Sequence, residues 1–134
     1  IAIKSVHYSV GLTVLLLVFI RIGVRVSYKM ADIVPLPSTL IRLLAKSVHL
    51  VLYGFMIVMP IIGWVILSAE GEQVLFYGLS LPALVVADSQ LAHSAEDIHK
   101  LLATIAYFVI GLHALAALFH HYIKRDNAIK RMLP

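Results

Sequence analysis

The sequence contains no cysteine among its 134 residues. This absence excludes a disulfide framework, a thiolate zinc site, an iron–sulfur cluster and the covalent attachment of a c-type haem. A haem in this protein would have to be held by histidine or methionine instead. The sequence has 7 histidines and 4 methionines for that role.

Charge is also scarce. Charged residues make up 13% of the chain and hydrophobic residues 61%, and the mean hydropathy is +0.96. A soluble domain carries about 25% charged residues, so this composition excludes an ordinary soluble domain and predicts a membrane protein. No polar stretch is long enough for a separate core. We therefore expect one membrane-embedded domain over residues 1–134.

Three apolar segments are long enough to cross a bilayer, and we predict spans at about residues 5–27, 43–68 and 97–123. The fold class predicted from this pattern is an all-α membrane protein, a bundle of transmembrane helices. The segment between the second and third spans is expected to lie against the membrane surface.

The prolines and the helix-capping residues of the sequence support the same division into three spans. Pro35 and Pro37 interrupt the chain between the first two spans, and Ser38 or Thr39 is placed to cap the second helix. Pro60 lies within the second span, where we expect a kink. Acidic side chains suit a helix N-terminus, so the third helix is expected to begin near its two adjacent acids, Glu96 and Asp97.

The charges of the two signs fall on opposite sides of a three-span arrangement. By the positive-inside rule the basic side is cytoplasmic, and the net charge of +4 reflects topology and attraction to anionic lipid rather than nucleic-acid binding. This orientation puts Ile1 on the outer side, so we expect an earlier helix that delivers it there. The basic group comprises Arg21, Arg25, Lys29, Arg42, Lys46, Lys124, Arg125, Lys130 and Arg131, and the acidic group Glu70, Glu72, Asp88, Glu96 and Asp97.

Two histidines are the strongest functional signal. His99 and His113 are 14 residues apart within the third span, which corresponds to a rotation of about 1400°, within roughly 40° of whole turns, and a rise of about 21 Å. Both imidazoles therefore face the same way at two depths. A histidine in hydrocarbon usually marks function, and imidazole is the usual ligand of b-type haem iron. The alternative is a pair of polar residues satisfied at helix contacts.

Depth sorts the histidines into levels. His7 begins the first span at its outer end, level with His99, and the two are placed to clamp one haem. His113 needs a partner at its own level, and His49 is the one candidate in this chain. His49 is equally suited to support a ligand or contact a substrate, and an earlier helix is a further source of the ligand.

Other polar residues have two interpretations each. Arg21 follows His7 at the spacing by which His113 follows His99, so it is placed to meet a haem propionate or to reach lipid phosphate. His120 suits a quinone carbonyl or the membrane interface, and Lys46, Ser47 and His49 offer polar groups for the same quinone head. His121 is expected to be interfacial and His93 exposed. Lys4 and Lys100 form either a positive rim that attracts a small anion to the outer haem or ordinary interfacial lysines.

Three segments carry a resemblance to a known family: HLVLYGFMIVMPIIG, IHKLLATIAYFVIGLHALAALFHH and FHHYIKRDNAIKRMLP. They resemble the bacterial cytochrome b561 family of small di-haem cytochromes, and the resemblance covers essentially the whole chain. It implies a four-helix bundle with two b haems, of which this chain supplies three spans. It further implies that His7 and His99 ligate the outer haem, and that His113 ligates the inner haem with a histidine of a preceding helix, which makes His49 less favoured as an axial ligand.

The predicted function is transmembrane electron transfer through two b haems, with irons roughly 20 Å apart, between a periplasmic donor or acceptor such as superoxide and the ubiquinone pool. The protein would then be an oxidoreductase of the bacterial inner membrane, with lipid and ubiquinone as partners and a homodimer or partner redox protein left open. One alternative is a haem-bearing anchor subunit for another redox enzyme. Another is a haem-free structural or transport bundle.

Overall fold

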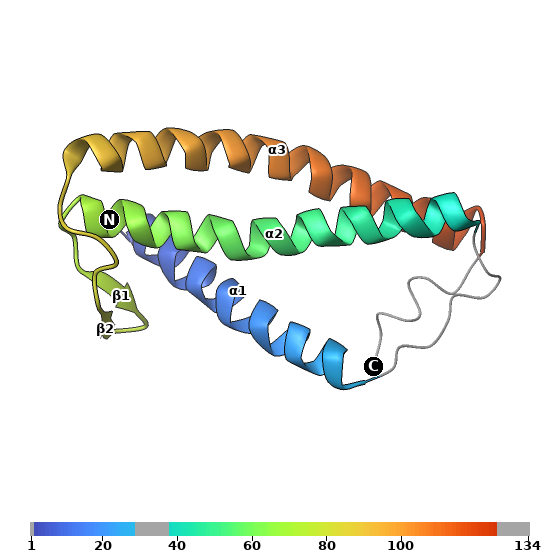
Figure 1. Ribbon diagram of the computed structural model, residues 1–134, viewed down its shortest axis with the longest axis horizontal. Helices are drawn as coiled ribbons and strands as arrows, with labels where there is room; N and C mark the ends of the chain where they lie inside the picture. The colour runs from blue at the N-terminus through green and yellow to red at the C-terminus, as the bar shows by residue number, and fades with distance from the viewer. Residues whose placement is uncertain (1, 29–37, 126–134) are drawn as a thin grey trace.

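Three long helices and one small hairpin make up the fold (Figure 1). The computed structural model describes residues 2–28 and 38–125 of the chain. The predicted turn around Pro35 and Pro37 and the basic tail from residue 126 onward lie outside the described residues. The elements, in chain order, are α1 (Ala2–Ser27), α2 (Thr39–Ala69), β1 (Val74–Phe76), β2 (Leu79–Leu81) and α3 (Ser89–Tyr122).

In Figure 1, α1 and α3 run from left to right and α2 runs back between them. α3 lies antiparallel along α2, whereas α1 meets α2 near the hairpin and then diverges from it. Within the described ranges, α1 and α3 each pack on α2, and their Cα atoms come no closer than 8 Å to one another. Both α1 and α3 therefore pack on α2, while the backbones of α1 and α3 stay apart from each other.

Most apolar side chains of these helices point outward. All three helices are long and apolar enough to span a membrane, and 11% or less of each apolar stretch is buried inside the protein. Leu17 on α1, Leu50 on α2 and Leu112 on α3 are examples of exposed large side chains. Exposed apolar surface on this scale is stable only against lipid. The predicted fold class, a bundle of transmembrane helices, is confirmed.

The helix starts confirm one prediction and correct another. Ser38 caps α2, because its side chain accepts a hydrogen bond from the backbone N–H of Ile41 at 3.4 Å, and α2 continues through Pro60 as one helix. The third helix does not begin near residue 97. It begins at Ser89, because the extended Asp88 accepts hydrogen bonds from the N–H groups of Gln90 and Leu91.

The end of α2 is fixed by a glycine turn. Gly71 has a φ of +74°, its N–H donates to the Ser68 carbonyl, and the N–H of Glu72 donates to the Leu67 carbonyl. This pair of bonds is the Schellman arrangement that ends many helices. The chain then forms an antiparallel hairpin with Val74 opposite Leu81, turning at Tyr77 and Gly78, both with positive φ. The hairpin was not predicted from the sequence.

Four of the five described residues with the lowest exposed fractions lie where the hairpin connection meets α2. Leu67, Ser68, Ala69 and Val74 are each 3% exposed or less. The Ser68 hydroxyl donates to the Trp64 carbonyl and accepts from the N–H of Leu84. The indole N–H of Trp64 donates to the Pro82 carbonyl at 3.0 Å. The connection between α2 and α3 is therefore held tightly over one end of the bundle.

Candidate functional site

Two histidine pairs bridge different helices. The first joins His7 on α1 to His99 on α3, with ring centres 6.3 Å apart and ring planes at 76°. These two residues come from the first and last helices of the chain, yet they meet at the level that the depth argument predicts. They approach across the face of α2 where α1 and α3 do not pack against each other.

The first separation fits a metal ion between the rings. A five-membered ring with bonds of about 1.33 Å has its atoms about 1.1 Å from its centre, and a nitrogen–metal bond is about 2.0–2.1 Å long. Two imidazoles on opposite sides of one metal ion therefore have centres about 6.3 Å apart. The distance between His7 and His99 has this value.

The surroundings of His99 fit the same use. Its Nδ1 atom is buried and has no hydrogen-bond partner within the described part of the chain. A Cβ built on Gly63 of α2 would lie 3.7 Å from the His99 ring, so the α2 backbone passes close to this ring. A Cβ built on Gly11 of α1 meets no atom within 4 Å. Space therefore remains beside α1 one turn from His7, as a flat haem would need.

The second pair joins His49 on α2 to His113 on α3. Their ring centres are 5.5 Å apart, with planes at 72°. This is nearly 1 Å shorter than two imidazoles on opposite sides of an iron require. The two rings therefore contact each other more closely than two trans ligands would.

The two levels repeat one spacing on two antiparallel helices. On α3, His113 follows His99 by about four helical turns, and on α2 the same interval separates His49 from Gly63. His49 meets His113 at one level, and Gly63 meets His99 at the other. The structure thus places Gly63 beside a candidate ligand.

Arg21 has a partner that the sequence did not reveal. Its Nε donates to the Tyr53 hydroxyl on α2 at 3.1 Å. Tyr53 is one turn from His49, and Arg21 and Arg25 lie near enough to His49 to interact with it electrostatically. These residues form a basic cluster at the His49–His113 level. It could hold a carboxylate such as a haem propionate, the role predicted for Arg21.

The residues predicted for a quinone site differ in their exposure and in the contacts that they already make within the protein. The Ser47 hydroxyl donates to the Leu43 carbonyl of its own helix at 3.0 Å, so its proton is already used. Lys46 is exposed. His120 is partly buried and packs edge-on against Phe119, with ring centres 6.1 Å apart. Of the four candidates, His49 is the one whose ring the structure brings beside another candidate ligand.

The two lysines of the outer rim are not equivalent. Lys100 forms an ion pair with Glu96, with Nζ and Oε1 2.8 Å apart. Lys4 forms no ion pair with any described residue. The predicted positive rim therefore depends chiefly on Lys4, because the charge of Lys100 is largely balanced by its neighbour.

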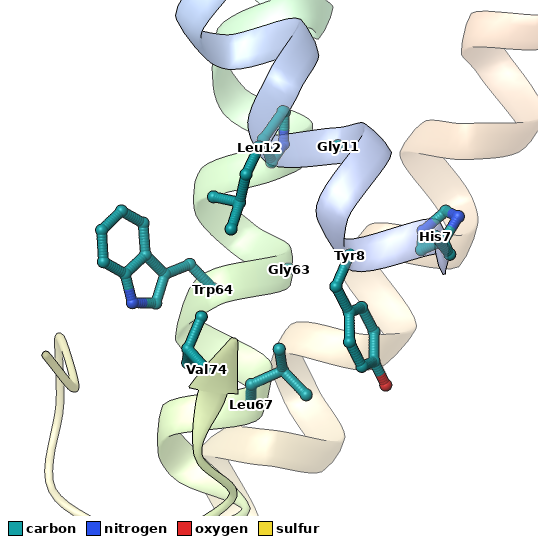
Figure 2. A pocket seen from close by; sticks show the side chains of 9 residues that line it. His7, Tyr8, Gly11, Leu12, Gly63, Trp64, Leu67 and Val74 are labelled. Atoms are coloured by element: carbon teal, nitrogen blue, oxygen red, sulfur yellow. The ribbon is translucent and has the colours of Figure 1, made fainter. Parts of the chain in front are cut away.

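A small cavity lies between α1 and α2 beneath the hairpin (Figure 2). Tyr8, Leu12, Trp64 and Val74 are among the residues that line it, together with both glycines described above. Figure 2 shows His7 at the edge of this cavity, on the side of α1 toward α3. His7 thus lies between this cavity and α3.

The two remaining histidines give one confirmation and one difference. His93 is exposed, as predicted. His121 is partly buried rather than simply interfacial, and its Nδ1 has no hydrogen-bond partner among the described residues. The sequence offered no signal for this burial, because His121 follows His120 directly at the end of the third span.

Comparisons with known proteins agree with this architecture. The family model for prokaryotic cytochrome b561 matches residues 1–134. A probable superoxide oxidase, CybB, from Yersinia pestis is 44% identical over 131 residues, which cover 98% of this chain and 74% of that protein. Cytochrome b561 homolog 1 of Escherichia coli (strain K12) is 34% identical over 131 residues, covering 98% of this chain and 74% of that protein.

These matches extend over nearly all of the chain and include the segments with all four paired histidines. The family implies b-type haem and transmembrane electron transfer, and three spans place the protein in the bacterial inner membrane as a multi-pass oxidoreductase. The match to the family model over the whole length, together with these identities, shows that the chain belongs to the prokaryotic cytochrome b561 family.

Proposed function

We propose that the protein carries electrons between a donor at its His7–His99 end and ubiquinone at its His49–His113 end, using two b-type haems. The observation that carries this proposal is the 6.3 Å separation of the His7 and His99 ring centres, which matches two imidazoles facing one iron. The second histidine level, further along α3, supports a second haem.

The chain's own residues do three things in this mechanism. His7 and His99 would hold the haem and fix its orientation, and Gly63 leaves the α2 backbone close to that site. The apolar helices exclude water. A b-type haem held there would supply an iron that gains and loses one electron.

At the other level we propose His113 as a haem ligand and His49 as a residue of the quinone site. The 5.5 Å contact between the rings is too short for trans ligands, which supports a different role for His49. His49 is placed to donate a hydrogen bond to a quinone carbonyl, with Lys46, Ser47 and His120 as further candidates at this end. Arg21, held by Tyr53, is our candidate for a propionate contact.

Superoxide is our candidate donor. A relative 44% identical to this chain is named a probable superoxide oxidase. Lys4, which forms no ion pair with a described residue, supplies a positive charge near His7 that favours approach of a small anion. This arrangement suits removal of an electron from superoxide at one membrane face and delivery to quinone within the membrane.

Spectroscopy of histidine variants tests the proposal. We expect His7→Ala and His99→Ala each to remove the same haem, because bis-histidine ligation fails when either bond is lost. Haem content per protein and low-temperature reduced-minus-oxidised spectra should match between the two variants.

His93→Ala is the matched control, since it removes an exposed histidine from the same helix as His99. It should retain the full spectrum. Loss of different haems from the two ligand variants, or retention of both haems by either one, would show that His7 and His99 do not share an iron.

A further inference from the structure

The segment that contains the hairpin is unusually apolar for a connection between helices. Residues 74–87 read VLFYGLSLPALVVA and include no charged side chain. Connections exposed to water are normally rich in polar residues. Within this segment Tyr77 and Ser80 alone carry side-chain polar groups.

The hairpin is folded back beside the helices rather than projecting beyond them (Figure 1). The Tyr77 hydroxyl lies 3.1 Å from Thr13 Oγ1 on α1. Thr13 is ten residues after Ile3, where the apolar stretch of α1 begins, which corresponds to about 15 Å along the helix. The Tyr77 hydroxyl therefore reaches the apolar stretch of α1, and the hairpin lies beside this helix rather than beyond its end.

The polar side chains of the hairpin are paired in a way that suits an apolar setting. Thr13 donates its one hydroxyl proton to the Ser9 carbonyl at 2.7 Å, so the hydroxyl of Tyr77 must donate to Thr13. Ser80 accepts a hydrogen bond from Gln73 at 2.9 Å. Both polar side chains of the segment thus have a hydrogen-bond partner within the protein, which lowers the free-energy cost of an apolar setting.

The side chains that remain uncovered are apolar. Val74 is buried against the helices, whereas Leu75 is 46% exposed and Leu79, beside the turn, is 67% exposed. This uncovered surface continues the lipid-facing surface of α1. Open strand edges are not accommodated in the hydrocarbon core, so the backbone belongs at the boundary between headgroups and acyl chains.

We propose that the hairpin is a membrane-inserted element: it lies at the headgroup boundary of the leaflet on the His7–His99 side, with Leu75 and Leu79 in contact with lipid acyl chains. Amphipathic elements of this kind bury their apolar face about 5–10 Å into that boundary. The pairing of Tyr77 with Thr13 holds the hairpin at its depth.

The absence of cysteine makes a direct test simple, because a single introduced thiol is unique. Leu79→Cys and Leu75→Cys place a thiol on the proposed lipid face. Glu72→Cys is the hydrated control in the same connection, and Leu16→Cys on α1 is the lipid-facing benchmark. Each variant is reconstituted in lipid nanodiscs, which leave both faces open, and its reaction with a membrane-impermeant maleimide is timed.

We expect both hairpin thiols to react at least fivefold more slowly than the Glu72→Cys thiol and to resemble Leu16→Cys. All four should react fully in sodium dodecyl sulfate, and an unchanged haem spectrum should show that each variant is folded. Because these side chains are exposed among the described residues, reaction as slow as that of Leu16→Cys indicates contact with lipid. Protection of less than fivefold at both hairpin positions would overturn the proposal.

Discussion

At the scale of single residues, the same side chain occurs in two different geometries at two depths. The ring centres of His7 and His99 are separated by the distance that an intervening iron requires, whereas those of His49 and His113 are closer than that. Imidazole chemistry is common to all four residues. The separation of the rings at each level is therefore the basis on which we propose different roles for them.

This difference predicts unequal effects of two alanine variants. His113→Ala should remove the second haem, which would halve the haem content. His49→Ala should leave the haem content intact and slow the exchange of electrons with a quinone analogue, because it removes a hydrogen-bond donor beside the haem rather than a ligand. Pyridine haemochrome assays and quinone turnover by the same preparations measure both effects. Loss of a haem from His49→Ala would reverse the assignment.

At the scale of elements, the connection between α2 and α3 is the best-packed part of the described chain. A Schellman turn at Gly71 ends α2, and the Asp88 cap begins α3. The N–H of Asp88 also donates to the Ala69 carbonyl at 2.9 Å, so the end of one helix is joined directly to the start of the next. His99 follows on the third turn of α3, and its position therefore depends on where this helix begins.

The cap predicts a measurable loss of stability. Asp88→Ala removes the acceptor of two backbone N–H groups and should lower the free energy of unfolding by about 1 kcal/mol. Asp88→Ser should recover most of it. Asp97→Ala removes a carboxylate from the interior of the same helix and should cost little, although the sequence had suggested that region as the helix start. Thermal melts followed by haem absorbance compare the three, and equal losses for Asp88→Ala and Asp97→Ala would contradict the cap.

Sequence reasoning reached the features that depend on position along one helix. The three spans, the Ser38 cap and the level of His7 with His99 follow from hydropathy, cap chemistry and a rise of about 1.5 Å per residue. It missed features that depend on the register between elements. The bond from Arg21 to Tyr53 requires knowing how α1 faces α2, and the hairpin requires knowing that Tyr77 can reach Thr13. The start of α3 was missed because Asp88 competes with two later acids that look equally suitable.

At the scale of the whole molecule, the two ends differ in charge as well as in ligand geometry. The His7–His99 end carries most of the acidic residues, and its two rim lysines are Lys4 and Lys100. Lys100 is paired with Glu96, whereas Lys4 forms no ion pair with a described residue. Attraction of an anion to this end must therefore be local rather than a property of the whole face.

We therefore expect Lys4 and the Lys100–Glu96 pair to contribute unequally to the reaction with superoxide or another small anion. A unit charge about 7 Å away in water contributes about 0.6 kcal/mol, a factor of about three in rate. Lys4→Gln should lower the second-order rate of haem reduction by about that factor at low salt and flatten its dependence on ionic strength. A Lys100→Gln, Glu96→Gln double variant should have a smaller effect, because it removes both members of the ion pair and leaves the net charge unchanged. Stopped-flow measurements at several salt concentrations would refute this view if Lys4→Gln and the double variant changed the salt slope equally.

The spacing that α2 and α3 share makes these helices intolerant of changes in length. One residue inserted between His99 and His113 would rotate the second level by about 100° relative to the first. It would turn His113 away from His49 while leaving His99 beside Gly63. Insertion of seven residues would restore the facing direction to within roughly 20° but move the level by about 10 Å, past its partner on α2. Insertions and deletions are therefore expected outside the intervals from His49 to Gly63 and from His99 to His113. These two equal intervals set the distance between the two histidine levels, which an electron would cross in the proposed function.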